Sequence, residues 1–153
     1  MAVVKTILKN TEQEAVVKVA GTAAAATITL ATDLLSSRQA LDGETQTVTI
    51  AGLQWTGDTN GIISIARNSV VITTLQANAG GALEMNGQTM IPDSIEATKD
   101  IVVTISGAQS ECWIRLKKVS GYKPKVEYAS FGAYDDETRV GASTTTSGSP
   151  DKV

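Results

Sequence analysis

Alternation of apolar and polar residues is the pattern that most constrains the fold of this chain. In several short runs Val, Ile, Leu or Ala occupies every second position, mostly with Thr or Ser between. The clearest runs are 26–30, 47–50, 63–65, 101–105 and 112–117. Successive side chains of a strand point to opposite faces, so the pattern predicts strands with one face on a core and the other in water.

Turn residues separate these runs. Asn and Gly reach the positive φ angles that tight hairpins require. Such turns are expected at Asn60-Gly61, Gly80-Gly81, Asn86-Gly87 and Ser106-Gly107, and at Arg67-Asn68 before an arm at 70–75. With further runs at 3–8 and 15–19, about eight or nine short strands are expected. This favours an all-β fold with a β-sandwich or jelly-roll-like core.

One interval departs from the alternation. Residues 32–41 begin with a possible helix cap and carry apolar residues at helical spacing, and Gly43 follows as a stop. One or two helical turns and a loop across the end of the sandwich are equally compatible with this interval.

The sequence divides into a β-sandwich core, 1–120, and an extended C-terminal arm, 121–153. Only 4% of residues are aromatic, so the core must be aliphatic. The arm is too polar to bury enough apolar surface to fold alone. It nevertheless holds four of the six aromatic residues, which are Tyr122, Tyr128, Phe131 and Tyr134.

These four aromatic side chains predict that the arm docks on other subunits, because aromatic residues supply much of the binding energy at interfaces. Two alternatives stay open. The arm could be a disordered tail with incidental aromatic residues, or its aromatic residues could fold back on this chain's own sandwich as a lid.

The composition argues against catalysis. The chain has no histidine, the commonest general acid–base and transition-metal ligand. No phosphate loop, Cys/His set or nucleophile elbow is found. We therefore expect no catalytic residue, metal or cofactor, and a protein that is not an enzyme. The acidic run 135–137 is expected to be solvated rather than to hold calcium, and Cys112 to be a small buried hydrophobe.

The net charge and the hydropathy of the chain also limit which kinds of partner are expected. The net charge of −3 lacks the basic excess on which nucleic-acid binding depends. No run approaches the ~18 apolar residues of a membrane span. Nucleic acid and membrane are therefore not expected as partners. The N-terminus lacks the pattern of a signal peptide, so synthesis in a reducing cytoplasm is expected.

Trp113 is the candidate contact residue of the core. It falls on the polar face of the 112–117 strand, where a flat ring could stack on a sugar, or it could be partly packed under a loop or the arm. The neighbouring Arg115, Lys117 and Lys118 are expected to form a solvated basic strand face.

The chain resembles a group of small virion structural proteins of tailed phages, especially those of marine cyanobacteria. The resemblance covers nearly the full length. The residues that carry it are VKTILKNT (4–11), QEAVVKVAGT (13–22), SECWIRL (110–116), KVSGY (118–122) and GAYDD (132–136). The group is described as structural, so the resemblance implies a particle component and transfers no site residue.

The function expected is that of a capsid decoration, or cement, protein that stabilises the phage head through subunit contacts. The interface residues expected are Tyr122, Tyr128, Phe131, Tyr134 and Trp113. The expected partners are the major capsid protein or other virion proteins and further copies of this chain, in a virion assembled in the host cytoplasm. The alternatives are a neck, tail or baseplate component, and a carbohydrate-binding or adhesion module that uses Trp113.

Overall fold

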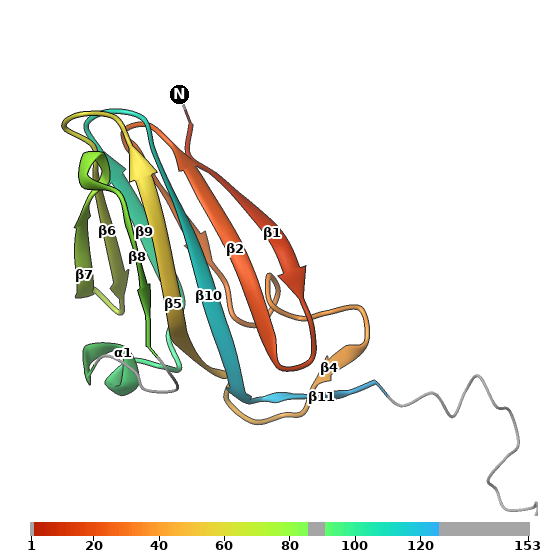
Figure 1. Ribbon diagram of the computed structural model, residues 1–153. Coiled ribbons are helices and arrows are strands. Elements are labelled where there is room, and N and C mark those ends of the chain that lie inside the picture. Colours follow the sequence, from red (N-terminus) through yellow and green to blue (C-terminus); the bar gives the residue numbers. More distant parts are fainter. Residues whose placement is uncertain (1, 86–90, 126–153) are drawn as a thin grey trace, which may run out of the picture. The chain divides into compact units, whose positions relative to one another are not determined.

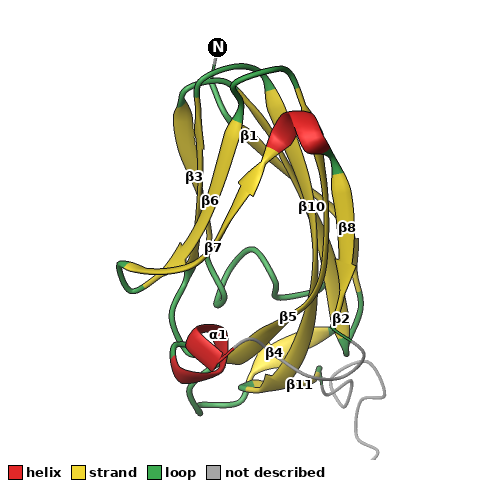
Figure 2. Ribbon diagram, turned by 60° about the vertical axis from the view of Figure 1, so that its left-hand side comes forward, coloured by secondary structure: helices red, strands yellow, loops and turns green. Residues whose placement is uncertain are grey.

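The computed structural model describes residues 2–85 and 91–125, which fold into two antiparallel sheets packed face to face (Figures 1 and 2). From edge to edge, the first sheet contains β1 (Val4–Asn10), β2 (Glu14–Gly21), β10 (Ser110–Ser120), β5 (Thr47–Gly57) and β8 (Gly81–Glu84). The second contains β3 (Ala24–Ile28), β9 (Ile101–Ser106), β6 (Ile62–Arg67) and β7 (Val70–Gln76). The remaining elements are a pair of short strands, β4 (Gln39–Leu41) with β11 (Tyr122–Pro124), and two single helical turns, η1 (Ala77–Ala79) and α1 (Ile91–Ile95).

The strand order defines a jelly roll. The antiparallel pairs are nested along the chain: β2 with β10, β3 with β9, β5 with β8, and β6 with β7. Successive pairs alternate between the two sheets, and the pairs β10–β5 and β9–β6 join them within each sheet. A long antiparallel ribbon wound in this way is the jelly-roll topology. The all-β, jelly-roll-like sandwich predicted from the sequence is therefore confirmed.

The core lies between the two sheets and is aliphatic, as the composition predicts. Buried and partly exposed residues alternate strictly along β2, β6 and most of β10. The inward residues are Val, Ile, Leu and Ala together with Cys112, and Trp55 and Tyr122 pack against the margin of this cluster. The compact unit that contains both sheets extends to Lys123.

Several predicted turns are confirmed and one is displaced. Asn60 and Gly107 adopt positive φ angles of 71° and 79°. The β6–β7 hairpin turns through Asn68 and Ser69, both with positive φ, as in a type I′ turn. The turn predicted at Arg67-Asn68 is therefore wrong by one residue, because Arg67 belongs to β6.

Of the two alternatives left open for 32–41, the loop describes the interval: turns and irregular segments occupy 30–38, and the short strand β4 follows. The short helix α1 was not predicted. It has five residues, with Pro92 next to its start, which is too short for a periodic apolar pattern. The predicted turn at Asn86-Gly87 and the acidic run 135–137 lie outside the described residues.

Arg67 continues the inward alternation of β6 and is completely buried. Its Nη1 donates to Asp93 Oδ1 at 2.7 Å and to the Val48 carbonyl at 2.7 Å. Its Nε and Nη2 donate to the carbonyls of Lys99 and Ala97 at 2.9 and 2.8 Å. One guanidinium thus joins β6 to β5 and to the segment that follows α1.

Asp93, on α1, completes this arrangement from the other side. Its side chain is also completely buried, and its Oδ2 accepts a hydrogen bond from the Ile50 backbone N–H at 2.9 Å. Both oxygens of the carboxylate therefore have partners, one charged and one from β5. A buried ion pair is tolerated only when its remaining polar atoms are satisfied in this way.

The Arg67→Met variant should lose about 3–5 kcal/mol of unfolding free energy, because it leaves the Asp93 carboxylate buried without its counter-ion. The measurement is urea denaturation followed by tryptophan fluorescence. The double variant Arg67→Met/Asp93→Leu should be more stable than the single variant, because no unpaired carboxylate remains, but less stable than the wild type, because the Val48 and Lys99 carbonyls and the Ile50 N–H lose their partners. Equal stability of the wild type and the single variant would contradict the proposed role of the pair.

The buried thiol of Cys112 predicts a pH dependence of stability. Burial raises the pKa of Cys112 from 9.0 to about 12. The unfolded chain therefore loses this proton at a lower pH than the folded protein, and the associated stability is lost as pH rises from 9 towards 12. Between pH 8 and 10.5 the free energy of unfolding of the wild type should fall by about 2 kcal/mol more than that of Cys112→Ala. Urea denaturation of both proteins under reducing conditions checks this, and parallel curves would contradict it.

Candidate functional site

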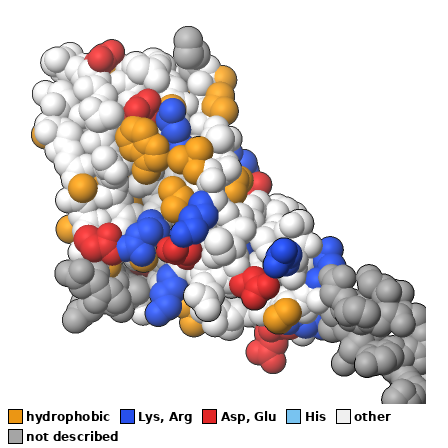
Figure 3. Space-filling model, turned by 45° about the vertical axis from the view of Figure 1, so that its right-hand side comes forward, with side chains coloured by type: hydrophobic (Ala, Val, Ile, Leu, Met, Phe, Trp, Pro, Cys, Tyr) orange, Lys and Arg blue, Asp and Glu red, His pale blue; other side chains and the backbone are white. Residues whose placement is uncertain are grey.

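The candidate site lies on the outer face of the five-stranded sheet, around Trp113 in the middle of β10. Trp113 is half-buried and points away from the core, between the inward residues Cys112 and Ile114, as predicted. Its cross-strand neighbours are Lys18 on β2 and Gln54 on β5. Figure 3 shows hydrophobic side chains gathered in the middle of this face, with basic and acidic side chains around them.

Lys18 contacts the indole of Trp113 from the β2 side. Its Nζ lies 5.6 Å from the ring centroid, within the range of a cation–π interaction. On the other side of β10 the surface is hollowed. This hollow measures about 340 Å³, and its lining residues come mainly from β10, β5 and β8: Val16, Gly52, Leu53, Gln54, Ala82, Leu83, Glu84, Trp113 and Arg115.

Small residues create the hollow. Gly52 on β5 and Ala82 on β8 offer little bulk between the larger Trp113, Arg115 and Leu83. A Cβ atom at Gly52 would lie 3.1 Å from Glu84 Oε1 and 3.5 Å from Arg115 Nε. The missing side chain at position 52 therefore leaves room for Arg115 to reach across β5.

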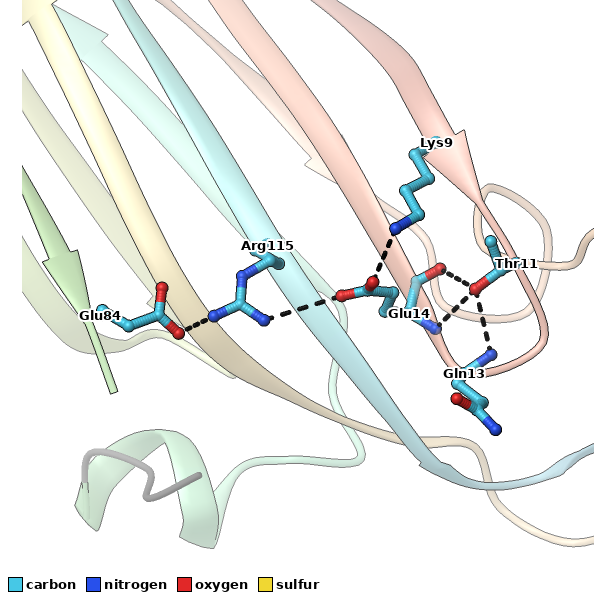
Figure 4. A network of polar contacts seen from close by, with 6 residues as sticks. All are labelled: Lys9, Thr11, Gln13, Glu14, Glu84 and Arg115. Carbon is cyan, nitrogen blue, oxygen red and sulfur yellow. Dashed lines mark hydrogen bonds and ion pairs between the residues drawn. The ribbon is translucent and has the colours of Figure 1, made fainter. Parts of the chain in front are cut away.

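A ladder of charges crosses the same face, from β1 to β8 (Figure 4). Lys9 Nζ lies 2.7 Å from one carboxylate oxygen of Glu14, and Arg115 Nη1 lies 3.7 Å from the other. Arg115 Nη2 pairs with Glu84. The hydrogen bond from Lys9 and the charge of Lys9 lower the pKa of Glu14, desolvation opposes them, and Arg115 lowers this pKa further. These exposed pairs add little stability, but they hold the guanidinium between two carboxylates.

Trp55, the second tryptophan, does not share this face. It packs against the margin of the core. A Cβ atom at Gly81 would lie 2.9 Å from its Cζ2 atom, so β8 can pass the ring closely only because residue 81 is glycine. The two tryptophans therefore have different surroundings, and Trp113 alone of them lines the outer hollow.

Tyr122, predicted as the first anchor of the arm, contacts the core of its own chain. It begins β11, which pairs with β4, and its hydroxyl donates to the Leu30 carbonyl at 2.5 Å. Burial, with the charge of Asp100, raises the pKa of Tyr122 to about 12. Tyr128, Phe131 and Tyr134 lie outside the described residues, so their contacts with other subunits stay predictions.

The position of Lys118 differs from the one expected from the sequence. Lys118 was expected on a solvated basic face with Arg115 and Lys117, but its side chain is buried. Its Nζ donates to Asn10 Oδ1, the Thr11 carbonyl and Gln39 Oε1 at 2.6 to 2.8 Å. Desolvation lowers the pKa of Lys118 to about 8, against the charge of Glu12. The alternation itself points position 118 inward, which was the available signal.

Within the described part of the chain, no three His, Cys, Asp or Glu side chains gather in a way that could hold a metal ion. The helices found there are too short and too polar to cross a membrane.

Comparison with known proteins yields only distant structural likeness. No protein-family model matches the chain, and no curated protein matches it. One similar solved structure is an uncharacterised conserved protein with a double-stranded β-helix domain from Klebsiella pneumoniae subsp. pneumoniae. The sequences are 12% identical, the match covers 82% of this chain and 85% of that one, and the TM-score is 0.35. The jelly-roll topology of this chain is defined by its own strand order.

The Tyr122→Phe variant should lose about 1 kcal/mol of unfolding free energy, because the Leu30 carbonyl loses its hydrogen-bond donor. Thermal and urea denaturation of the full chain measure this loss. Tyr128→Phe, with the same chemical change outside the described residues, is the matched control. An unchanged stability of Tyr122→Phe would show that the hydroxyl is not part of the fold.

Proposed function

We propose that the protein is a virion structural protein, and specifically a capsid decoration protein of a tailed phage. Its partners are the major capsid protein or other virion proteins and further copies of itself. The resemblance of its sequence to small phage structural proteins supports this proposal. A neck, tail or baseplate position is the alternative within the same class.

The observation that carries the proposal is the exposed apolar edge formed by β1. Three large aliphatic side chains of this strand are exposed: Val4 by 59%, Ile7 by 37% and Leu8 by 52%. β1 is the outermost strand of its sheet, so its far side has no strand partner among the described residues. Exposed apolar groups beside an unpaired strand edge are typical of a protein–protein contact.

β1 also carries features that oppose unspecific pairing. Its register with β2 shifts between Ile7 and Lys9, which leaves Leu8 as a bulged residue. Lys5 and Lys9 interrupt the apolar side chains, and both are anchored, Lys5 to Asp33 and Lys9 to Glu14. Bulges and lysines on an edge strand discourage open-ended association. A contact at this edge is therefore expected to be selective.

The buried charged side chains all have partners within the fold, and this agrees with a protein that acts by binding. Arg67, Asp93 and Lys118 are the buried charged residues of the described chain. All three are held by several partners within the fold. They support the sandwich and are not exposed to a ligand.

If copies of the protein also contact one another on a symmetric shell, their individually weak edge contacts would act together through multivalency.

The Leu8→Asp variant should bind phage heads at least about tenfold more weakly, because burying a charged group in place of a leucine forfeits more than 1.4 kcal/mol. Co-sedimentation of the purified full chain with heads that lack it measures the binding. Val71→Asp is the matched control, since Val71 is 55% exposed on β7 at the edge of the other sheet.

Two outcomes would contradict the proposal in different ways. Binding to isolated tails but not to heads would favour the neck, tail or baseplate position. Failure of the wild-type protein to bind any part of the particle would overturn a virion role altogether. Equal loss in Leu8→Asp and Val71→Asp would show that β1 is not the contact.

A further inference from the structure

We propose that the outer hollow beside Trp113 is a binding site for an uncharged saccharide, with one sugar ring stacked on Trp113 and its hydroxyls bound by Gln54 and the Arg115–Glu84 pair. This site is separate from the particle contact proposed for β1, and neither proposal requires the other.

The hollow supplies an apolar surface of the right kind. Trp113 forms one wall, and Lys18 contacts its indole from β2, whereas most lining residues come from β5 and β8. The indole is therefore accessible from the side of the hollow. An aromatic ring offers a flat apolar surface that matches the C–H face of a sugar ring. The volume of about 340 Å³ is at the small end of the range for ligand sites, roughly 300–1,000 Å³.

The hollow also supplies planar polar groups at its rim. The Gln54 amide is exposed and offers both a donor and an acceptor. The Arg115 guanidinium is held in place between Glu14 and Glu84, and the Glu84 side chain remains 54% exposed. Because the charge ladder fixes Arg115 before any ligand arrives, little side-chain freedom would be lost on binding. Neighbouring hydroxyls of a sugar suit such paired donors and acceptors.

The balance of charges around Arg115 favours an uncharged ligand over an anion. Arg115 is already matched by Glu14 and Glu84, so an anion would have to displace a carboxylate. The chain has 13 basic and 16 acidic residues, of which two and five lie in 126–153, so residues 1–125 hold 11 of each sign. No basic field is therefore available to attract a polyanion.

The mixed lining selects a hydroxylated ligand over a purely apolar one. A hydrocarbon in the hollow would remove water from Gln54, Glu84 and Arg115. It could not form hydrogen bonds in place of those that the three side chains make to water, so its binding would be unfavourable. A saccharide has both an apolar ring face and many hydroxyls. It meets the two requirements at once.

The test is affinity electrophoresis of the full chain in gels that contain a neutral polysaccharide, with an α-glucan, a β-glucan and a galactomannan as probes. At least one of them should retard the wild type. Trp113→Ala should weaken that binding at least about tenfold, and Trp113→Phe by less, because it keeps a stacking ring. Thr56→Ala, an exposed position on β5 outside the hollow, is the matched control and should bind normally.

Circular dichroism and thermal unfolding establish that each variant is folded. If Trp113→Ala does not fold, Gln54→Ala replaces it as the test variant and should show the same direction of change. Absence of retardation by all three probes would overturn the proposal, as would full binding by the folded Trp113→Ala and Gln54→Ala variants. Loss of head attachment in Trp113→Ala, without saccharide binding by the wild type, would instead identify this face as a protein contact.

Discussion

The buried pair of Arg67 and Asp93 is the interaction on which one end of the sandwich depends. The carbonyls of Val48, Ala97 and Lys99 converge there and accept hydrogen bonds from one guanidinium. The Ala97 carbonyl also accepts the Val48 backbone N–H at 3.0 Å, whereas a buried carbonyl left without any donor costs about 1–3 kcal/mol. An arginine suits this position because its five donors are fixed in a plane. The pair itself need not be more stabilising than apolar residues; its effect is to hold the segment after α1 at a defined place on β5 and β6.

Strand β10 connects this framework to the outer face. It lies between β2 and β5, the two strands with which it forms its longest pairings. Its inward side chains, from Cys112 to Lys118, reach the core and the turn between β1 and β2. Its outward side chains include Trp113 and Arg115. The candidate site is therefore built on the strand with the greatest support from its neighbours, which is the condition for holding a binding geometry before the ligand arrives.

The sequence predicts the features that depend on local alternation, and these include the aliphatic core, the outward direction of Trp113 and all strands of the described residues except the short β4, β8 and β11. It fails where a charged residue takes an inward position. Arg67 was assigned to a turn, and Lys118 to a solvated face, because charged side chains are rarely buried without partners. Those partners come from residues as distant in sequence as Asp93 and Asn10, which only the folded topology brings near. The hollow was not predicted for the same reason, since Gly52 and Ala82 lie far apart in sequence and only the pairing of β5 with β8 brings them near each other, with Gly52 opposite Glu84 and Ala82 opposite Gln54.

The two proposed surfaces belong to one sheet yet can act separately. β1 forms one edge, and the hollow lies toward β8 at the other. With strands about 4.8 Å apart, roughly 10–19 Å separates β1 from the strands that line most of the hollow. A contact confined to the β1 edge would leave Trp113 accessible. The charge ladder from Lys9 to Glu84 does span this distance, but each exposed pair contributes at most about 1 kcal/mol. A change at β1 can therefore shift the position of Arg115 only weakly, and attachment and ligand binding are expected to be nearly independent.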